Sequence, residues 1–225
     1  MVRFDIISEP LPRRLRDGID RLSTVLKADQ WASANAEGLN PTQAHVITFL
    51  AGRDADGMRV KAIAGHLGVS QPTATDSIAA LERKGLVIKT VDPTDMRALA
   101  VAITEAGRDA VKAIGLSTMA TEQAVASLTL GEQADLLLLI TKLIRSLQSS
   151  GAISGQRMCP TCSHFRPYAH PGENLPHHCE FVNAAFGNRH LRLDCGEHQP
   201  AEPSAQAATW RTFTNKGPAS LQTNN

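Results

Sequence analysis

The sequence has no long apolar segment. The run of large apolar residues from Leu136 to Ile140 stops at Thr141 and Lys142, far short of the roughly 20 residues that a helix needs to cross a bilayer. The first residues, Met-Val-Arg-Phe-Asp-Ile, also lack the apolar stretch and small-residue cleavage site of a signal peptide. We therefore expect a cytoplasmic protein, whose thiols stay reduced.

An excess of charge of one sign is missing too. The net charge is +1 at pH 7, so any contact with DNA must come from a local basic patch rather than from an overall field. The sequence contains no nucleophile motif, no glycine-rich phosphate loop and no carboxylate pair. These absences predict that the protein is not an enzyme.

Cysteine is absent from most of the chain, because all four cysteines lie between residues 159 and 195. Six of the eight histidines lie between 164 and 198. The composition changes near residues 149–155, Ser-Ser-Gly-Ala-Ile-Ser-Gly, which have the small side chains of a linker. We therefore divide the chain into residues 1–150, 151–200 and 201–225. At 225 residues it is long enough for one core and an appended module.

Helical patterns dominate the first 85 residues. Residues 11–34 show apolar side chains at helical spacing, and Asn40-Pro41-Thr42-Gln43 is a helix start signal. A short helix over 60–67 is expected to end at Gly68. Ser70 then caps a helix that ends at Gly85. Two short helices joined by a glycine-containing turn predict a helix-turn-helix.

A two-stranded ribbon is expected directly after this pair. Residues 86–91 and 98–103 read as strands, and the second one alternates Leu99, Val101 and Ile103 with alanine, as in a half-buried strand. Asp92-Pro93 and Asp95 supply turn chemistry between them. A helix that fits the major groove beside a basic loop is how a winged helix meets DNA. The sequence thus predicts a mainly α fold with a two-stranded wing, an α+β winged helix-turn-helix.

Two more helices complete the first 150 residues. Thr104 is expected to cap a helix that runs to about residue 128, and Thr129 with Glu132 forms a capping box for the next. That helix carries five consecutive large apolar residues, Leu136 to Ile140. One chain of this size does not cover every side of such a helix, which predicts an all-helical dimerisation region and a homodimer.

Three motifs carry a family resemblance over about residues 10–150. Gly85-Leu-Val, Asp92-Pro-Thr-Asp-Met-Arg and Leu99-Ala-Val-Ala-Ile-Thr-Glu-Ala-Gly resemble the MarR family of transcriptional regulators. The resemblance implies a homodimer that binds pseudo-palindromic double-stranded operator DNA. We expect a repressor, with an activator as the alternative, and a small-molecule effector is a further candidate partner.

The resemblance also implies DNA-binding residues. Arg97 corresponds to the wing arginine, held by Asp95. The recognition-helix positions are Ser70, Gln71, Pro72, Thr73 and Thr75. Arg83 and Lys84 are further candidates, with ordinary solvated charges as the alternative. Many relatives carry a basic residue where this chain has Asp76, whose carboxylate would repel phosphates unless it accepts from a cytosine amino group.

The four cysteines form a second motif. Cys159-Pro-Thr-Cys162 is followed by Cys179 after sixteen residues and by Cys195 after fifteen more. A Cys-x-x-Cys knuckle offers two thiolates to one metal centre, and two further thiolates complete a tetrahedron. A segment of this length with few apolar residues needs a staple to fold, which a metal supplies. We therefore predict a metal-stapled module over residues 151–200.

The metal itself stays open between Zn²⁺ and an iron–sulfur cluster, since four thiolates suit both. The spacing loosely resembles high-potential iron–sulfur proteins and small four-cysteine modules that end in Cys-Gly-Glu. His177 or His178 could replace the adjacent Cys179. The leading hypothesis is a regulator whose module senses redox or metal status. The alternatives are a zinc-stapled interaction protein and an electron carrier that uses its winged helix for protein contacts. Residues 201–225 are expected to be a disordered tail.

Overall fold

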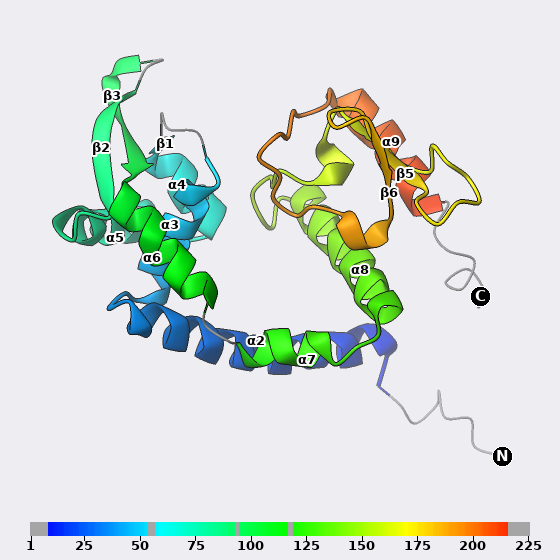
Figure 1. Cartoon of the computed structure of the whole chain (residues 1–225), viewed down its shortest axis with the longest axis horizontal. Coiled ribbons are helices and arrows are strands. Elements are labelled where there is room, and N and C mark those ends of the chain that lie inside the picture. Colours follow the sequence, from blue (N-terminus) through cyan, green and yellow to red (C-terminus); the bar gives the residue numbers. More distant parts are fainter. Residues whose placement is uncertain (1–8, 54–56, 93–94, 117–118, 216–225) are drawn as a thin grey trace.

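The computed structural model describes residues 9–53, 57–92, 95–116 and 119–215 and shows two lobes (Figure 1). One lobe holds α3 to α6 and the β1–β3 sheet, the other holds α8, α9 and a small second sheet, and α2 and α7 run beneath. No helix in these ranges is long and apolar enough to cross a membrane.

The first lobe, with α2 beneath it, follows the predicted order of helices and strands. The elements are α2 (Leu11–Ala36), α3 (Pro41–Ala51), β1 (Met58–Arg59), α4 (Val60–Leu67), α5 (Gln71–Arg83), β2 (Val87–Asp92), β3 (Asp95–Ile103) and α6 (Glu105–Leu116). The three strands form an antiparallel sheet in the order β1-β3-β2. The predicted winged helix-turn-helix is thereby confirmed. The strand β1 was not predicted, because two residues are too few to show a periodic pattern.

The predicted helix ends are confirmed by their hydrogen bonds. Asn40 Oδ1 accepts from the Gln43 N–H at 2.9 Å, and Gln43 Oε1 accepts from the Asn40 N–H at 3.3 Å. Ser70 Oγ accepts from the Thr73 N–H at 3.2 Å. Gly68 ends α4 at a φ of 66°, in the left-handed region that favours glycine.

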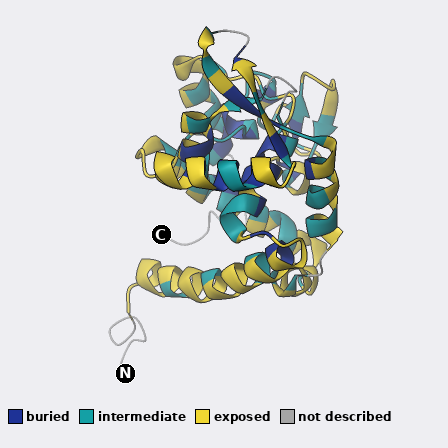
Figure 2. Cartoon of the chain, turned by 90° about the vertical axis from the view of Figure 1, so that its left-hand side faces the viewer, coloured by how far each residue is buried: buried dark blue, intermediate teal, exposed yellow. Residues whose placement is uncertain are grey.

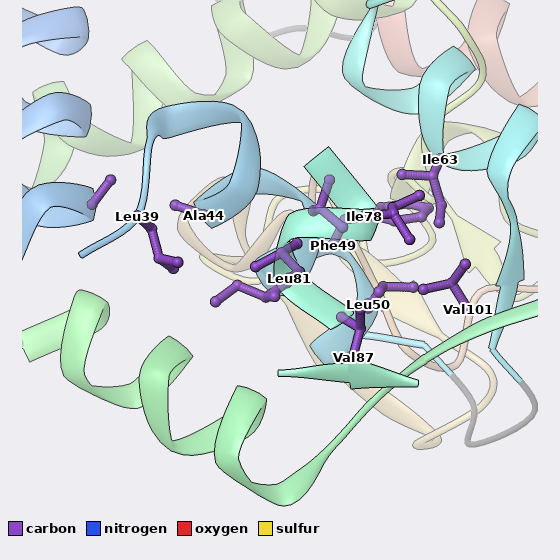
Figure 3. Close-up of a cluster of buried hydrophobic side chains, with 12 residues drawn as sticks. Leu39, Ala44, Phe49, Leu50, Ile63, Ile78, Leu81, Val87 and Val101 are labelled. Atoms are coloured by element: carbon purple, nitrogen blue, oxygen red, sulfur yellow. The ribbon is translucent and has the colours of Figure 1, made fainter. Parts of the chain in front are cut away.

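The core of the first lobe lies between α3, α5 and the sheet (Figure 3). Its least exposed members include Val46, Ile47, Leu50, Ile63, Ile78, Leu81, Val87 and Val101. β3 is the central strand, so Ala100, Val101 and Ala102 are all buried and the predicted half-buried pattern is wrong there. Leu99, farther along the ribbon, is 55% exposed.

The Thr-x-x-Gly motif has a steric reason. Thr104 Oγ1 accepts from the Gly107 N–H at 3.1 Å and donates to the Gly85 carbonyl at 2.7 Å. A Cβ on Gly107 would lie 2.2 Å from the Leu86 carbonyl oxygen. Only glycine therefore lets α6 start so close to the end of α5.

The single helix expected from Thr104 to about residue 128 is wrong. α6 ends at Leu116, and α7 covers Ala120–Ala126, with residues 117 and 118 outside the described ranges. The new helix begins on α2, because the Asp29 carboxylate accepts from the N–H groups of Ala120 and Thr121 and from the Thr121 hydroxyl. These bonds satisfy N–H groups that a helix start leaves open, and they lower the pKa of Asp29.

The second lobe joins α8 to the cysteine-containing segment. It consists of α8 (Leu130–Ser149), η1 (Cys159–Thr161), β4 (Phe165–Arg166), β5 (His177–Cys179), β6 (Ala184–Phe186), η2 (Asn188–His190) and α9 (Pro203–Asn215). The strands form an antiparallel sheet in the order β4-β5-β6. The capping box of Thr129 and Glu132 at the start of α8 is confirmed.

One hydrophobic core spans the boundary that we expected near residue 150. Leu138 of α8 packs with Phe165, Leu191 and Phe213, each at most 5% exposed. The expected linker begins with the tight end of α8, because Gly151 has a φ of 73° and the Ala152 N–H donates to the Leu147 carbonyl. The cysteine segment is thus packed on α8 rather than loosely tethered to it.

The expected disorder after residue 200 is wrong for residues 203–215. They form α9, and Phe213 is fully buried with its ring centroid 5.6 Å from that of Phe165. Trp210 packs one helical turn earlier. The composition of this segment is polar enough to suggest disorder, but two aromatic anchors stabilise the helix on the second core. Residues 216–225 lie outside the described ranges.

Candidate nucleic-acid interface and cysteine site

The start of α5 presents a polar surface. Ala74, Ile78 and Leu81 point into the core, and five predicted positions are exposed together: Ser70, Gln71, Pro72, Thr73 and Thr75. Backbone N–H groups at a helix N-terminus and nearby hydroxyls suit phosphate oxygens and base edges. The exposed Asp76 lies on the same helix, so its carboxylate either repels phosphate or accepts from a base amino group.

The hydroxyls of this surface are already oriented. Ser70 Oγ and Thr73 Oγ1 lie 2.7 Å apart, and Thr75 Oγ1 donates to the Gln71 carbonyl at 2.9 Å. Since each hydroxyl keeps a free lone pair or proton, these bonds restrict the side chains without removing their ability to contact DNA.

The wing arginine is exposed beside a carboxylate that holds its backbone. Asp95 Oδ1 accepts from the Arg97 N–H at 3.1 Å. The ion pair of Asp95 is with Arg59, at 3.4 Å, and Arg59 also pairs with Asp92. The predicted contact between Asp95 and Arg97 therefore exists through the main chain. Among the described residues the guanidinium of Arg97 has no ion-pair partner, which leaves it available for phosphates or a minor groove.

Arg59 is a residue that the sequence patterns did not reveal. It belongs to β1 and bonds Asp92 and Asp95, which lie opposite each other at the ends of β2 and β3 that form the tip of the wing. No motif marks an arginine 33 and 36 residues away from its partners. Arg59 stabilises the ribbon that carries Arg97.

The other basic candidates differ from one another. Arg83 is exposed near the end of α5. Lys84 Nζ instead donates to the Gly38 carbonyl and lies 3.5 Å from Gln43 Oε1, so the structure ties it to the start of α3. Lys89 of β2 pairs with Glu82 of α5 at 2.6 Å. That ion pair fixes the ribbon beside the helix.

A recognition helix supported by two short helices, with an adjacent ribbon whose arginine is exposed, defines the winged helix-turn-helix class of DNA-binding folds. The sequence profile of the MarR family matches residues 37–98, from before α3 into the wing. This part of the chain is therefore similar to the MarR family. A comparison with curated proteins finds no matching relative.

Solved structures share the same fold. CouR from Rhodococcus jostii, bound to p-coumaroyl-CoA, matches with a TM-score of 0.50 and 23% identity over 63% of this chain and 94% of its own. The MarR-family regulator Sco5413 from Streptomyces coelicolor matches with a TM-score of 0.52 and 20% identity, over 62% of this chain and 98% of its own. MepR from S. aureus in a complex with DNA matches with a TM-score of 0.50 and 26% identity, over 58% of this chain and 94% of its own. More than a third of this chain lies outside each match.

All four cysteines line one cavity of about 440 Å³ in the second lobe. Cys159 and Cys162 come from η1 and its end, Cys179 from β5, and Cys195 from the loop that follows η2. Phe165 and Phe186 form part of the apolar wall, and Arg189 and Arg192 also line the cavity. The structure thus brings together the four residues that the spacing predicts as ligands. Their binding of a metal or cluster stays a prediction.

The cysteine side chains do not converge on one point. In the described part of the chain, no group of three or more Cys, His, Asp or Glu side chains is arranged to hold a single metal ion. Cys159 Sγ accepts from the Arg192 N–H at 3.3 Å. Burial raises the pKa of the Cys159 thiol to about 11.

The two histidines next to Cys179 have other partners, whereas His164 and His190 line the cavity. His177 is fully buried, its Nδ1 accepts from the Tyr168 N–H, and its Nε2 lies 2.9 Å from Asn188 Oδ1. His178 Nδ1 lies 3.2 Å from His170 Nε2. Cys179 lines the cavity and these two histidines do not, which favours the cysteine as the third predicted ligand.

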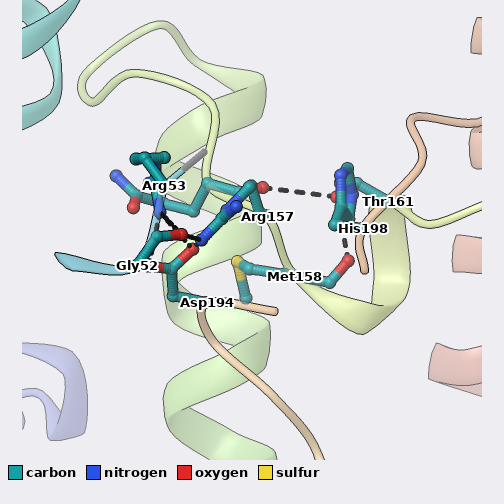
Figure 4. A network of polar contacts seen from close by, with 8 residues as sticks. Gly52, Arg53, Arg157, Met158, Thr161, Asp194 and His198 are labelled. Carbon is teal, nitrogen blue, oxygen red and sulfur yellow. Dashed lines mark hydrogen bonds and ion pairs between the residues drawn. The ribbon is translucent and has the colours of Figure 1, made fainter. Parts of the chain in front are cut away.

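A bridge of three charged side chains joins the two lobes (Figure 4). Asp194, next to Cys195, accepts from Arg157 Nε at 2.7 Å and from Arg53 Nη1 at 2.9 Å. Arg157 also donates to the Gly52 carbonyl at the end of α3, and the Arg53 guanidinium lies 4.1 Å from the centre of the Phe49 ring. We call Arg53, Arg157 and Asp194 the Asp194 bridge. It connects the last cysteine to the core of the winged helix.

Two helices expose apolar stripes. Figure 2 shows α2 exposed along most of its length. Its stripe consists of Leu11, Leu15, Ile19, Leu22 and Leu26, each at least 44% exposed. The stripe of α8 consists of Leu136, Leu139, Leu143 and Leu147, each at least 36% exposed. Apolar positions three or four residues apart lie on one side of a helix, so each stripe is a continuous surface of the kind that a protein partner covers.

Proposed function

We propose that this chain is a homodimeric, sequence-specific DNA-binding transcriptional regulator of the repressor type, acting in the cytoplasm. The observation that supports it best is the surface formed by the exposed start of α5 and the adjacent wing with Arg97. MepR, 26% identical with a TM-score of 0.50, is bound to DNA in its structure. We also infer that the chain is not an enzyme, since MarR-family proteins are regulators. A small-molecule effector stays a prediction of the family resemblance.

Arg97 provides the test of DNA binding. A duplex is first selected from a random pool by the wild-type protein and then titrated at fixed salt with wild type and Arg97→Ala. Loss of a wing contact typically costs about 1–3 kcal/mol, which is roughly a 5- to 150-fold weaker affinity. Arg211→Ala, an exposed arginine of α9 far from the wing, is the matched control and should bind like wild type. Failure to select any duplex, or equal affinities for all three proteins, refutes the proposal.

The homodimer is proposed from the apolar stripes of α2 and α8. Leu139→Glu would place a carboxylate in the expected interface, at a cost of several kcal/mol if it is buried without a partner. We expect dissociated or unfolded protein in light scattering at micromolar concentration. Lys142→Glu is the control, because it adds a carboxylate on the same helix outside the stripe. A monomeric wild type contradicts the proposal.

We further propose that the four-cysteine module holds a metal centre, a zinc ion or an iron–sulfur cluster, and senses metal or redox status. Two contacts support this coupling. Leu138 places α8 in the core of the module, and the Asp194 bridge connects Cys195 with α3. A change at the cysteines is thereby transmitted to both the expected dimer helix and the DNA-binding lobe.

Operator affinity tests the coupling. A coupling of about 1–3 kcal/mol changes affinity by roughly 5- to 150-fold. We expect such a difference between metal-loaded wild type on one side and metal-stripped wild type or Cys162→Ser on the other. Equal affinities for all three, with dimers intact, would reduce the module to a brace without sensing.

A further inference from the structure

The two kinds of metal centre place their cysteine ligands differently. One zinc ion draws four sulfurs to a single point, each at about 2.3 Å. In an iron–sulfur cluster the cysteines bind different irons, so their sulfurs surround a body of several atoms. Here all four cysteines line a cavity of about 440 Å³. No three ligand side chains of the described residues are arranged around one ion. The cavity has room for an iron–sulfur cluster.

The elements that carry the cysteines favour the same choice. Zinc modules usually take their ligands as two close pairs. This chain has one pair, at Cys159 and Cys162, whereas Cys179 lies on β5 and Cys195 follows η2 as single residues. Iron–sulfur sequences include cysteine ligands far from the others, as Cys179 and Cys195 are here. The nearby His177 and His178, which would suit zinc, bond Asn188 and His170 instead.

The wall of the cavity suits a cluster of thiolates, iron and sulfide. Phe165, Leu175 and Phe186 line it, and an apolar wall limits the water that reaches a cluster. Arg189 and Arg192 bring positive charge, which offsets that of the thiolates. The Arg192 N–H donates to Cys159 Sγ, and hydrogen bonds to ligand sulfurs are among the features that set the potential of a cluster.

We propose that Cys159, Cys162, Cys179 and Cys195 bind one iron–sulfur cluster in this cavity. The inference rests on the metal centre of the proposed function and names its class. Phe181 and Val182, which also line the cavity, are 50% and 63% exposed. The cluster therefore lies close to the surface of the lobe, where small oxidants and iron chelators reach it.

The test uses the full chain, purified without oxygen and divided into two portions. One portion is incubated with ferrous iron and sulfide, the other with Zn²⁺. We expect the first to show broad visible absorption, with iron and acid-labile sulfide in equal numbers and every iron lost to a chelator after exposure to air. The second portion, which stays colourless with Zn²⁺, is the spectroscopic reference.

Variants assign the ligands. Cys179→Ser and Cys195→Ser should each lose most of the iron and sulfide, whereas Ser163→Ala, adjacent to Cys162 but outside the cavity lining, should keep both. Colourless protein that binds one zinc per chain and excludes iron and sulfide overturns the inference, and this result does not depend on how the variants fold. DNA affinity of the same samples separates the two proposals. If a protein that binds only zinc still binds operator DNA, the proposed regulator function stands and only the proposed cluster is refuted.

Discussion

The Asp194 bridge allows the contact between the two lobes to be measured. Replacing Asp194 with asparagine keeps the shape of the side chain but removes the charge that Arg53 and Arg157 share. The side chain of Arg53 is 9% exposed and that of Asp194 is 42% exposed. The variant therefore leaves a nearly buried guanidinium close to a second one.

The magnitude follows from this partial burial. Exposed ion pairs contribute about 0.2–1 kcal/mol, whereas removing one partner of a fully buried pair costs about 3–5 kcal/mol. With one partner buried and the other substantially exposed to solvent, we expect a coupling between Arg53 and Asp194 of about 1–2 kcal/mol.

A double-mutant cycle isolates this coupling. Urea unfolding of metal-loaded protein is compared for wild type, Arg53→Ala, Asp194→Asn and the double variant, because Arg53→Ala alone also removes the contact with Phe49. The control cycle uses Arg166 and Glu180, an ion pair in which both side chains are about half exposed, at 48% and 46%. Its coupling should stay below about 1 kcal/mol. A coupling of zero between Arg53 and Asp194 would refute the reasoning.

The bridge also has a defined pH dependence. Burial alone would raise the pKa of Asp194, but the hydrogen bonds from Arg157 and Arg53 outweigh it and lower the pKa below its ordinary value of 3.8. The ionised carboxylate therefore stabilises the folded chain fully above about pH 4 and progressively less as the pH falls through the folded pKa. Asp194→Asn should lose this part of the acid dependence of unfolding.

Two further predictions concern glycine and aromatic packing. Gly107→Ala should cost several kcal/mol in thermal unfolding, because its Cβ would lie 2.2 Å from the Leu86 carbonyl oxygen. Gly115→Ala, on the same helix with no atom within 4 Å of its Cβ, should instead stabilise by up to about 1 kcal/mol. Phe213→Ala should destabilise the second lobe by about 3–5 kcal/mol, since the ring is fully buried. The half-buried Thr212→Ala, next to it on α9, is its control, and equal melting temperatures for the two variants would contradict the assigned position of α9.

Local signals made most helix ends predictable. Asn40, Ser70 and Thr129 cap helices by bonds to residues three positions away, and Gly68 ends α4 through its own backbone, so neighbouring residues are enough to read them. The break between α6 and α7 depends on Asp29, about ninety residues away. The helix of residues 203–215 depends on Phe165. Such contacts form only in the folded chain and leave no periodic pattern.

The candidate sites divide in the same way. The start of the recognition helix and the set of four cysteines can be read from sequence motifs, a capping residue in one case and a Cys-x-x-Cys pair with two further cysteines in the other. Arg59, which bonds both strands of the wing, does not, and neither does Arg53, which is separated from Asp194 by 141 residues. The hydrogen bond from Lys84 to the Gly38 carbonyl could not be predicted either, because 46 residues separate the two. A basic residue at the end of a recognition helix looks the same in sequence whether it faces DNA or a carbonyl of its own chain.

The shared core of α8 and α9 has a consequence during synthesis. A chain emerges from the ribosome with its N-terminus first, so the winged helix is complete before Cys195 and Phe213 have been synthesised. Until residues 203–215 emerge, Leu138 lacks one of the aromatic side chains that cover it in the finished molecule. A newly made chain therefore passes through a stage in which its DNA-binding lobe is folded and its cysteine lobe is not. Delivery of a metal centre would then be the last step of maturation, after the capacity to meet DNA is already present.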